Sequence, residues 1–168
     1  GQSDSKLELS YAAEREQALQ IAYAFGYKAS NGSLERWLGS GAEDLYGVAR
    51  FTGAHRGDLP LYWHGQLGVT RIGESALLAA QQKDWLWFTG VSAEWFLNDR
   101  WSLIAQLDSH SALMKSEVDA VGKTAGMLSF GLRRQLGRQW ALDVSFAEDI
   151  VVESAPDIVF HASLHFRP

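Results

Sequence analysis

Residues 84–101 read DWLWFTGVSAEWFLNDRW and hold four of the chain's seven tryptophans. Trp85 and Trp87 lie at one end of this stretch, and Trp95 and Trp101 lie at the other. Along this stretch, successive residues belong to alternate faces of a strand. The face that carries Trp85, Trp87 and Trp95 is apolar, and the other face ends in Gly90, Ser92 and Glu94. This period-two pattern predicts a long β-strand with two unlike faces, followed by the three-residue hairpin turn NDR.

The same alternation recurs along the whole chain, and no stretch shows convincing helical periodicity. It predicts nine strands in an antiparallel up-and-down meander that forms a single domain over residues 1–168. Tight connections at 14–17, 55–59, 98–100 and 137–139 alternate with longer ones at 30–42, 73–83, 113–123 and 152–156. The expected strands span residues 7–13, 18–29, 43–55, 60–72, 84–97, 101–112, 124–135, 140–151 and 157–167.

Composition excludes several classes of function. A net charge of −5 argues against a basic surface that binds nucleic acid. The absence of cysteine removes disulfides, thiolate zinc sites and thiol catalysis. No run approaches about eighteen apolar residues, so no transmembrane helix is expected. The sequence opens on the polar segment GQSDS, where no signal peptide is visible.

Two kinds of barrel share the alternating pattern and place its faces oppositely. A soluble, lipocalin-like barrel turns its apolar face inward, whereas a transmembrane barrel turns its apolar face to lipid and its polar face to the lumen. Trp85 and Trp95 are ten residues apart, which is about 33 Å along a strand. At a tilt of about 45° this projects to roughly 23 Å, close to the apolar band of an outer-membrane barrel. The spacing therefore favours the transmembrane arrangement.

Aromatic residues on the apolar register gather near the strand ends, as in the girdles at the two membrane interfaces. We therefore expect an all-β, antiparallel up-and-down transmembrane β-barrel with eight to ten strands in this chain, or a part of a larger barrel. The expected location is the outer membrane of a Gram-negative bacterium. The predicted girdle consists of Trp63, Trp85, Trp87, Trp95, Trp101, Trp140 and Phe166.

These expectations also imply partners. The chain would contact outer-membrane lipids and lipopolysaccharide, would need the outer-membrane insertion machinery during assembly, and would act as a monomer without nucleic acid. Acidic residues such as Glu43, Glu74 and Asp84 gather on the long-loop side. They can hold divalent cations that bridge lipopolysaccharide phosphates, or they can simply be solvated loop charges.

The odd number of strands conflicts with the even number that single-chain bacterial barrels have. Either one strand assignment is wrong, or an upstream partner strand is absent from this chain. Both alternatives stay open at the level of the sequence.

Three segments carry a resemblance to a known family: HGQLGVTRIG (64–73), QQKDWLWFTGVSAEW (81–95) and EDIVVESAPDIVFHASLHF (148–166). They resemble the C-terminal half of the domain of unknown function 3187 family, from about residue 40 to the end. That resemblance implies an uncharacterised outer-membrane protein of a Gram-negative bacterium. Members of the family are nearly twice this length, so it also implies a C-terminal portion or a shortened member. It implies no activity, cofactor or functional residue.

Two pairs of residues on the polar register can be considered for catalysis. Asp108 and His110 are two apart and project to the same face, where such a pair can activate water as a general base. The pair resembles that of omptin-like outer-membrane proteases in a D-x-H tripeptide alone. That resemblance implies a further carboxylate across the barrel, a part that Asp149 or Asp84 would take. His161 and Ser163 share the polar register of the last strand and resemble the H-x-S of outer-membrane lipid A deacylases, although here the pair points inward. The other interpretation of both pairs is a hydrogen-bonded lumen network.

A second set of polar-register residues predicts a structural network near the tight-turn end. Charges inside a narrow barrel must pair because they are desolvated. We expect Arg133 to be the centre of this salt-bridge network. Its members would be Glu94, Arg133, Asp143, Arg50 and His165.

The histidines give little support for a metal site. His64, His110, His161 and His165 lie on the polar register, but no pair combines a tight ligand spacing with a nearby carboxylate. We therefore expect neither a metal nor a cofactor.

The sequence thus predicts an outer-membrane β-barrel protein with a structural, small-solute binding or transport role and no catalysis. One alternative is an outer-membrane hydrolase that uses Asp108 and His110 in the lumen. The other is a soluble, lipocalin-like binder of a small ligand.

Overall fold

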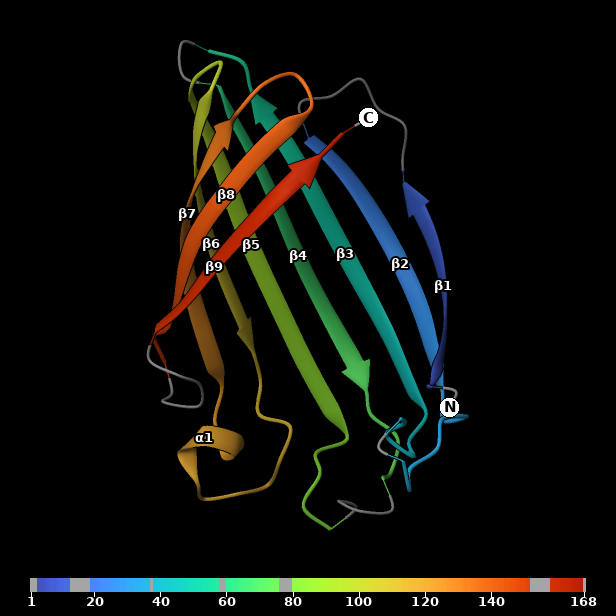
Figure 1. The fold of residues 1–168 in the computed structure, drawn as a ribbon. Helices are drawn as coiled ribbons and strands as arrows, with labels where there is room; N and C mark the ends of the chain where they lie inside the picture. The colour runs from blue at the N-terminus through green and yellow to red at the C-terminus, as the bar shows by residue number, and fades with distance from the viewer. Residues whose placement is uncertain are drawn as a thin grey trace.

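The structure, a computed structural model, describes residues 3–12, 19–36, 38–57, 60–75, 80–151 and 158–167. Within these residues the chain forms nine strands and one short helix (Figure 1). The elements are β1 (Ser5–Ala12), β2 (Leu19–Ala29), β3 (Asp44–His55), β4 (Leu61–Arg71), β5 (Trp85–Asn98), β6 (Trp101–His110), α1 (Asp119–Gly122), β7 (Ala125–Gln135), β8 (Trp140–Asp149) and β9 (Ile158–Phe166).

The nine strands form one antiparallel sheet whose order is the order of the chain, β1 to β9. Each expected strand is present, and each observed boundary lies within two residues of the expected one. The prediction of an all-β meander is therefore confirmed. The connections at 14–17 and 152–156 lie outside the described residues, as do parts of those at 30–42, 55–59 and 73–83.

One short helix accompanies the nine strands. Residues 119–122 in the connection between β6 and β7 form a single helical turn, α1. Asp119 lies in its first turn, and Lys123 pairs with the Asp119 carboxylate at 2.7 Å. A turn this short shows no helical periodicity in the sequence, and the chain remains all-β apart from it.

The sheet is strongly twisted and curved, so that β8 and β9 pass in front of β5 and β6 in Figure 1. Each described strand pairs with its neighbours in sequence, which leaves β1 and β9 as the two edges. The sheet is therefore open between these edges within the described residues, and a closed barrel is not seen.

One face of the sheet is polar and concave. Side chains on this face meet across an intervening strand, as those of Arg133 on β7 and Glu94 on β5 do over β6. Several of the most buried residues also lie on it, among them Ala24, Val48 and Ser102. Because every strand alternates, the polar face of the sequence analysis becomes one continuous surface on the inside of the curve.

The opposite face is apolar and exposed. It includes Leu9 on β1, Phe25 on β2, Trp85 on β5 and Phe160 on β9, the last with an exposed fraction of 78%. Within the described residues no large side chain is fully buried. None of the described helices is both long and apolar enough to cross a bilayer. Most of the exposed large apolar side chains therefore lie on the outer surface of the sheet, and the buried apolar residues among the described ones are small.

Candidate functional site

A charged cluster on the concave face has Arg133 of β7 at its centre. Its guanidinium donates to both carboxylate oxygens of Asp143 on β8, from Nε to Oδ1 at 2.8 Å and from Nη2 to Oδ2 at 2.7 Å. Nη1 donates to Glu94 on β5 at 3.1 Å, and the Ser102 hydroxyl on β6 donates to the same carboxylate at 2.6 Å. His165 Nε2 lies 3.1 Å from Asp143 Oδ2. These five side chains from five strands form what we call the Arg133 cluster.

Strand register explains why these residues meet. Ser102, Arg133 and Asp143 occupy one row across β6, β7 and β8, and the small Ser102 lets the arginine reach over β6 to Glu94. The paired groups are only partly exposed: 32% for Arg133, 21% for Glu94 and 19% for Asp143. Pairing offsets the cost of removing these charges from water. Four residues of the expected network are thus brought together.

The fifth residue of the expected network, Arg50, lies elsewhere. It pairs with Glu8 of β1 at 3.1 Å, and the Tyr46 hydroxyl donates to the same carboxylate at 2.8 Å. Glu8, Gly26 and Tyr46 share one row across β1, β2 and β3. The tyrosine ring lies over Gly26, where a Cβ atom would overlap it. Sequence reasoning missed this second cluster because it does not reveal which residues of different strands share a row.

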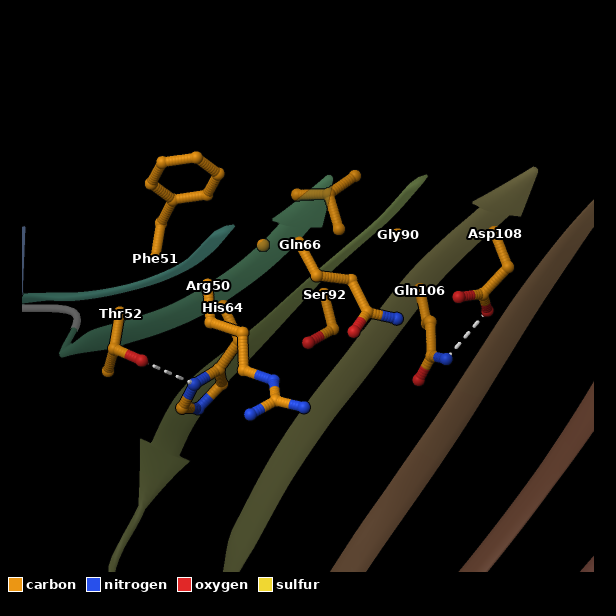
Figure 2. A pocket seen from close by; sticks show the side chains of 11 residues that line it. Arg50, Phe51, Thr52, His64, Gln66, Gly90, Ser92, Gln106 and Asp108 are labelled. Atoms are coloured by element: carbon orange, nitrogen blue, oxygen red, sulfur yellow. Dashed lines mark hydrogen bonds between the residues drawn. The ribbon is translucent and has the colours of Figure 1, made fainter. Parts of the chain in front are cut away.

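Between the two clusters the concave face is hollowed (Figure 2). The hollow has a volume of about 210 Å³ and spans β3 to β6. Figure 2 shows the side chain of Phe51 on the other side of the strands from those of Arg50 and His64. The polar residues that line the hollow are Arg50, Thr52, His64, Gln66, Ser92, Gln106 and Asp108.

Within this polar hollow, Gln106 donates an amide hydrogen bond to Asp108 at 2.6 Å. Thr52 and His64 are hydrogen bonded at 3.2 Å between Oγ1 and Nδ1. The floor is Gly90, where a Cβ atom would lie 2.6 Å from Asp108 Oδ1. A cation, a carboxylate and two amides around an open floor offer both donors and acceptors to a small polar molecule.

The structure does not join the proposed catalytic pair. Asp108 is held by Gln106, whereas His110 Nδ1 lies 3.0 Å from the backbone carbonyl of Ser111. Among the described contacts no hydrogen bond links Asp108 to His110. Within the described contacts, the Asp108–His110 pair therefore lacks the hydrogen bond that would orient a general base.

The residues of the second candidate pair, His161 and Ser163, lie opposite different residues of β8. His161 lies opposite Ser145 of β8, and Ser163 lies opposite Asp143. No hydrogen bond between His161 and Ser163 is present among the described contacts. Within the described residues, no group of three or more carboxylates and histidines is placed to hold a metal ion.

The aromatic residues expected at the membrane interfaces all lie on the apolar face. Trp140 and Phe166 pack at 4.8 Å between ring centroids, and Arg134 lies over the Trp101 ring at 5.0 Å from its centroid. The Trp63 ring covers Gly53 of the neighbouring strand, where a Cβ would overlap it. The remaining members, Trp85, Trp87 and Trp95, are exposed.

The chain matches the family model described as a protein of unknown function (DUF3187) over residues 3–167, and it belongs to this family. The resemblance found in the sequence is therefore confirmed. The match begins near the start of the chain rather than at about residue 40, so the expected extent is corrected. A comparison with curated proteins gives no match.

Proposed function

We propose that this chain forms the wall of an outer-membrane β-barrel whose polar inner face binds or passes a small polar solute without catalysis. The observation that carries this proposal is the exposed apolar face, which continues over all nine strands. Contiguous apolar patches of more than a few hundred Å² are rare on soluble monomers and mark a membrane or a partner. Lipid is the partner that suits a surface this continuous, framed by tryptophan near both ends of β5.

Two polar residues on the apolar face support a lipid environment. The Thr89 hydroxyl donates to the backbone carbonyl of Gln66 at 3.0 Å, and the Ser109 hydroxyl donates to that of Ala125 at 2.7 Å. Both groups thus find partners inside the sheet and need no water. An unpaired hydroxyl in hydrocarbon would cost several kcal/mol.

A membrane location requires the two open edges to be paired. Backbone groups have no water to bind in hydrocarbon, so a spanning sheet must close. β1 and β9 run in the same direction because an even number of antiparallel steps separates them. Closure therefore needs either a parallel β1–β9 contact or an odd number of additional antiparallel strands between these edges.

The solute-binding part of the proposal rests on the polar hollow. Arg50 and Asp108 supply opposite charges, while Gln66 and Gln106 supply amides. The other two functions considered have less support. A hydrolase would need Asp108 to be hydrogen bonded to His110, and no such bond is present among the described contacts. A soluble lipocalin-like binder would need its apolar face on the concave side.

Refolding the purified chain in detergent and into phosphatidylcholine vesicles tests the membrane part. We expect the unheated protein to migrate differently from the boiled protein on a semi-native gel, and to stay with vesicles after alkaline carbonate washing. A monodisperse protein in buffer without detergent that leaves the vesicles would refute the proposal.

A thermal-shift screen of amino acids and sugars tests the solute part. A ligand should raise the melting temperature of the refolded wild type but not that of Gly90→Leu, which fills the hollow. Gly137→Leu is the control because no atom lies within 4 Å of a Cβ placed there. If no solute acts, or if Gly90→Leu responds like the wild type, the polar hollow is not a binding site and a structural role remains.

A further inference from the structure

The apolar face carries one unpaired cation at the long-loop end of β4. Arg71 shares a row with Tyr27 on β2, Leu45 on β3 and Trp85 on β5. It is exposed, and it has no ion pair or side-chain hydrogen bond among the described residues. An arginine on the lipid face is tolerated near the interface but destabilises at the bilayer midplane. The adjacent Trp85 is of the residue type that marks such an interface.

Two hollows adjoin this row on the outer face. The first, at the level of Arg71, has a volume of about 700 Å³ and contains three acidic residues, Glu43, Glu74 and Asp84. All three are exposed. Glu43 accepts a hydrogen bond from the Tyr27 hydroxyl. One guanidinium and several carboxylates in one hollow suit a headgroup that carries both a negative and a positive charge.

The second hollow begins one row deeper and is almost wholly apolar. Its volume is about 500 Å³. Its floor is β3, where Gly47 and Ala49 occupy two successive positions of the outer register. The walls are formed by Tyr23 and Phe25 of β2, Leu67 and Val69 of β4, and Trp87 of β5. We call this hollow the β3 trough.

We infer that the outer surface of β2–β5 binds one phospholipid with a phosphate and a primary ammonium in its headgroup. The phosphate lies against Arg71, whose planar guanidinium can bind phosphate oxygens in pairs. The ammonium lies among the carboxylates of the upper hollow, and one acyl chain occupies the β3 trough. This inference rests on the proposed function, since it places this face in a bilayer.

Charge and shape select this lipid over others. A phosphatidylglycerol headgroup would bring only negative charge to a hollow that holds more carboxylates than cations. A choline headgroup carries a quaternary ammonium, which has no N–H to donate to Glu74 or Asp84. Lipid A without amine substituents would likewise bring only negative charge to this hollow.

Native mass spectrometry of the refolded protein in detergent tests the inference. Phosphatidylethanolamine, phosphatidylglycerol, phosphatidylcholine and lipid A are supplied together at equal concentration. The wild type is expected to retain one phosphatidylethanolamine in preference. Arg71→Gln should lower its retention roughly tenfold, which is the effect of losing one charge-assisted contact. Gly47→Leu should lower it as well by filling the β3 trough.

Arg134→Gln is the matched control, because Arg134 is also a cation on the outer face but lies over Trp101 at the opposite end of the sheet. It should leave retention unchanged. Preference for another of the four lipids, or equal loss in Arg134→Gln and Arg71→Gln, would overturn the inference. Heat-modifiable migration of each variant on a semi-native gel is measured in parallel. A protein that does not fold into a membrane refutes the proposed function, whereas a protein that folds without selective lipid binding refutes this inference alone.

Discussion

Arg133 and Asp143 form a two-point contact on the concave face, with Nε–Oδ1 and Nη2–Oδ2 distances of 2.8 and 2.7 Å. The planar guanidinium matches the carboxylate, so the contact fixes the orientation of both side chains. The same guanidinium holds Glu94 on the far side of β6. One side chain thus links β5, β7 and β8 of the curved sheet.

Replacing Arg133 by Leu should lower the free energy of unfolding by about 1–3 kcal/mol, because two partly buried carboxylates lose their partner. Urea unfolding of the refolded protein in detergent measures this. The control is Arg50→Leu, whose ion pair with Glu8 is more exposed, and whose loss should cost under about 1 kcal/mol. An equal or smaller loss for Arg133→Leu would show that the Arg133 cluster does not stabilise the sheet.

Gly26 and Tyr46 make a second testable contact. A Cβ at Gly26 would overlap the Tyr46 ring and displace its hydroxyl from Glu8. Gly26→Ala should therefore cost about 1–3 kcal/mol in the same assay. In a Tyr46→Ala background the same change should cost much less, because the ring that it displaces is gone. Additive effects of the two substitutions would contradict this account, and Gly137→Ala controls for the change from Gly to Ala.

The alternation of side chains was sufficient to predict the strands and their two faces. It places Trp85 and Trp87 on one face and Glu94 on the other without any knowledge of partners. It could not predict that Arg50 joins Glu8 rather than Asp143, because pairing of distant side chains depends on register between strands. Register follows from turn geometry and from contacts such as that of Tyr46 with Gly26. The sequence also does not predict whether the sheet closes into a barrel, because closure depends on which strands pair with the edges β1 and β9.

Asp4 should make the loop after β2 sensitive to acid. Its carboxylate accepts hydrogen bonds from the backbone N–H of Ser40 at 2.8 Å and from that of Gly32 at 2.9 Å. These bonds, that from Ser40 first, hold the pKa of Asp4 below its ordinary value. A lowered folded-state pKa means that the ionised form stabilises the loop. This contribution is present above the pKa of the unfolded chain and is lost as the pH falls through the folded-state pKa.

Hydrogen-exchange protection factors of the Gly32 and Ser40 amides, measured between roughly pH 6 and pH 2, should therefore fall in acid. Asp4→Asn should show low protection at both pH values, because the neutral amide binds these N–H groups more weakly than a carboxylate does. Protection in the wild type that is independent of pH would contradict the assigned role of Asp4.

The depth of tryptophans in a bilayer tests the membrane face directly. In single-tryptophan variants, with the other tryptophans replaced by Phe, Trp85 and Trp95 should be quenched most by lipids brominated near the headgroup, because interfacial tryptophans lie at that level. Val91→Trp, between them on the same face, should be quenched most by bromine near the chain ends. Ser92→Trp, on the polar face, serves as the control and should be quenched little at any depth. Equal quenching of all four positions would mean that the apolar face of β5 does not cross the hydrocarbon, and the tryptophan spacing would then need another explanation.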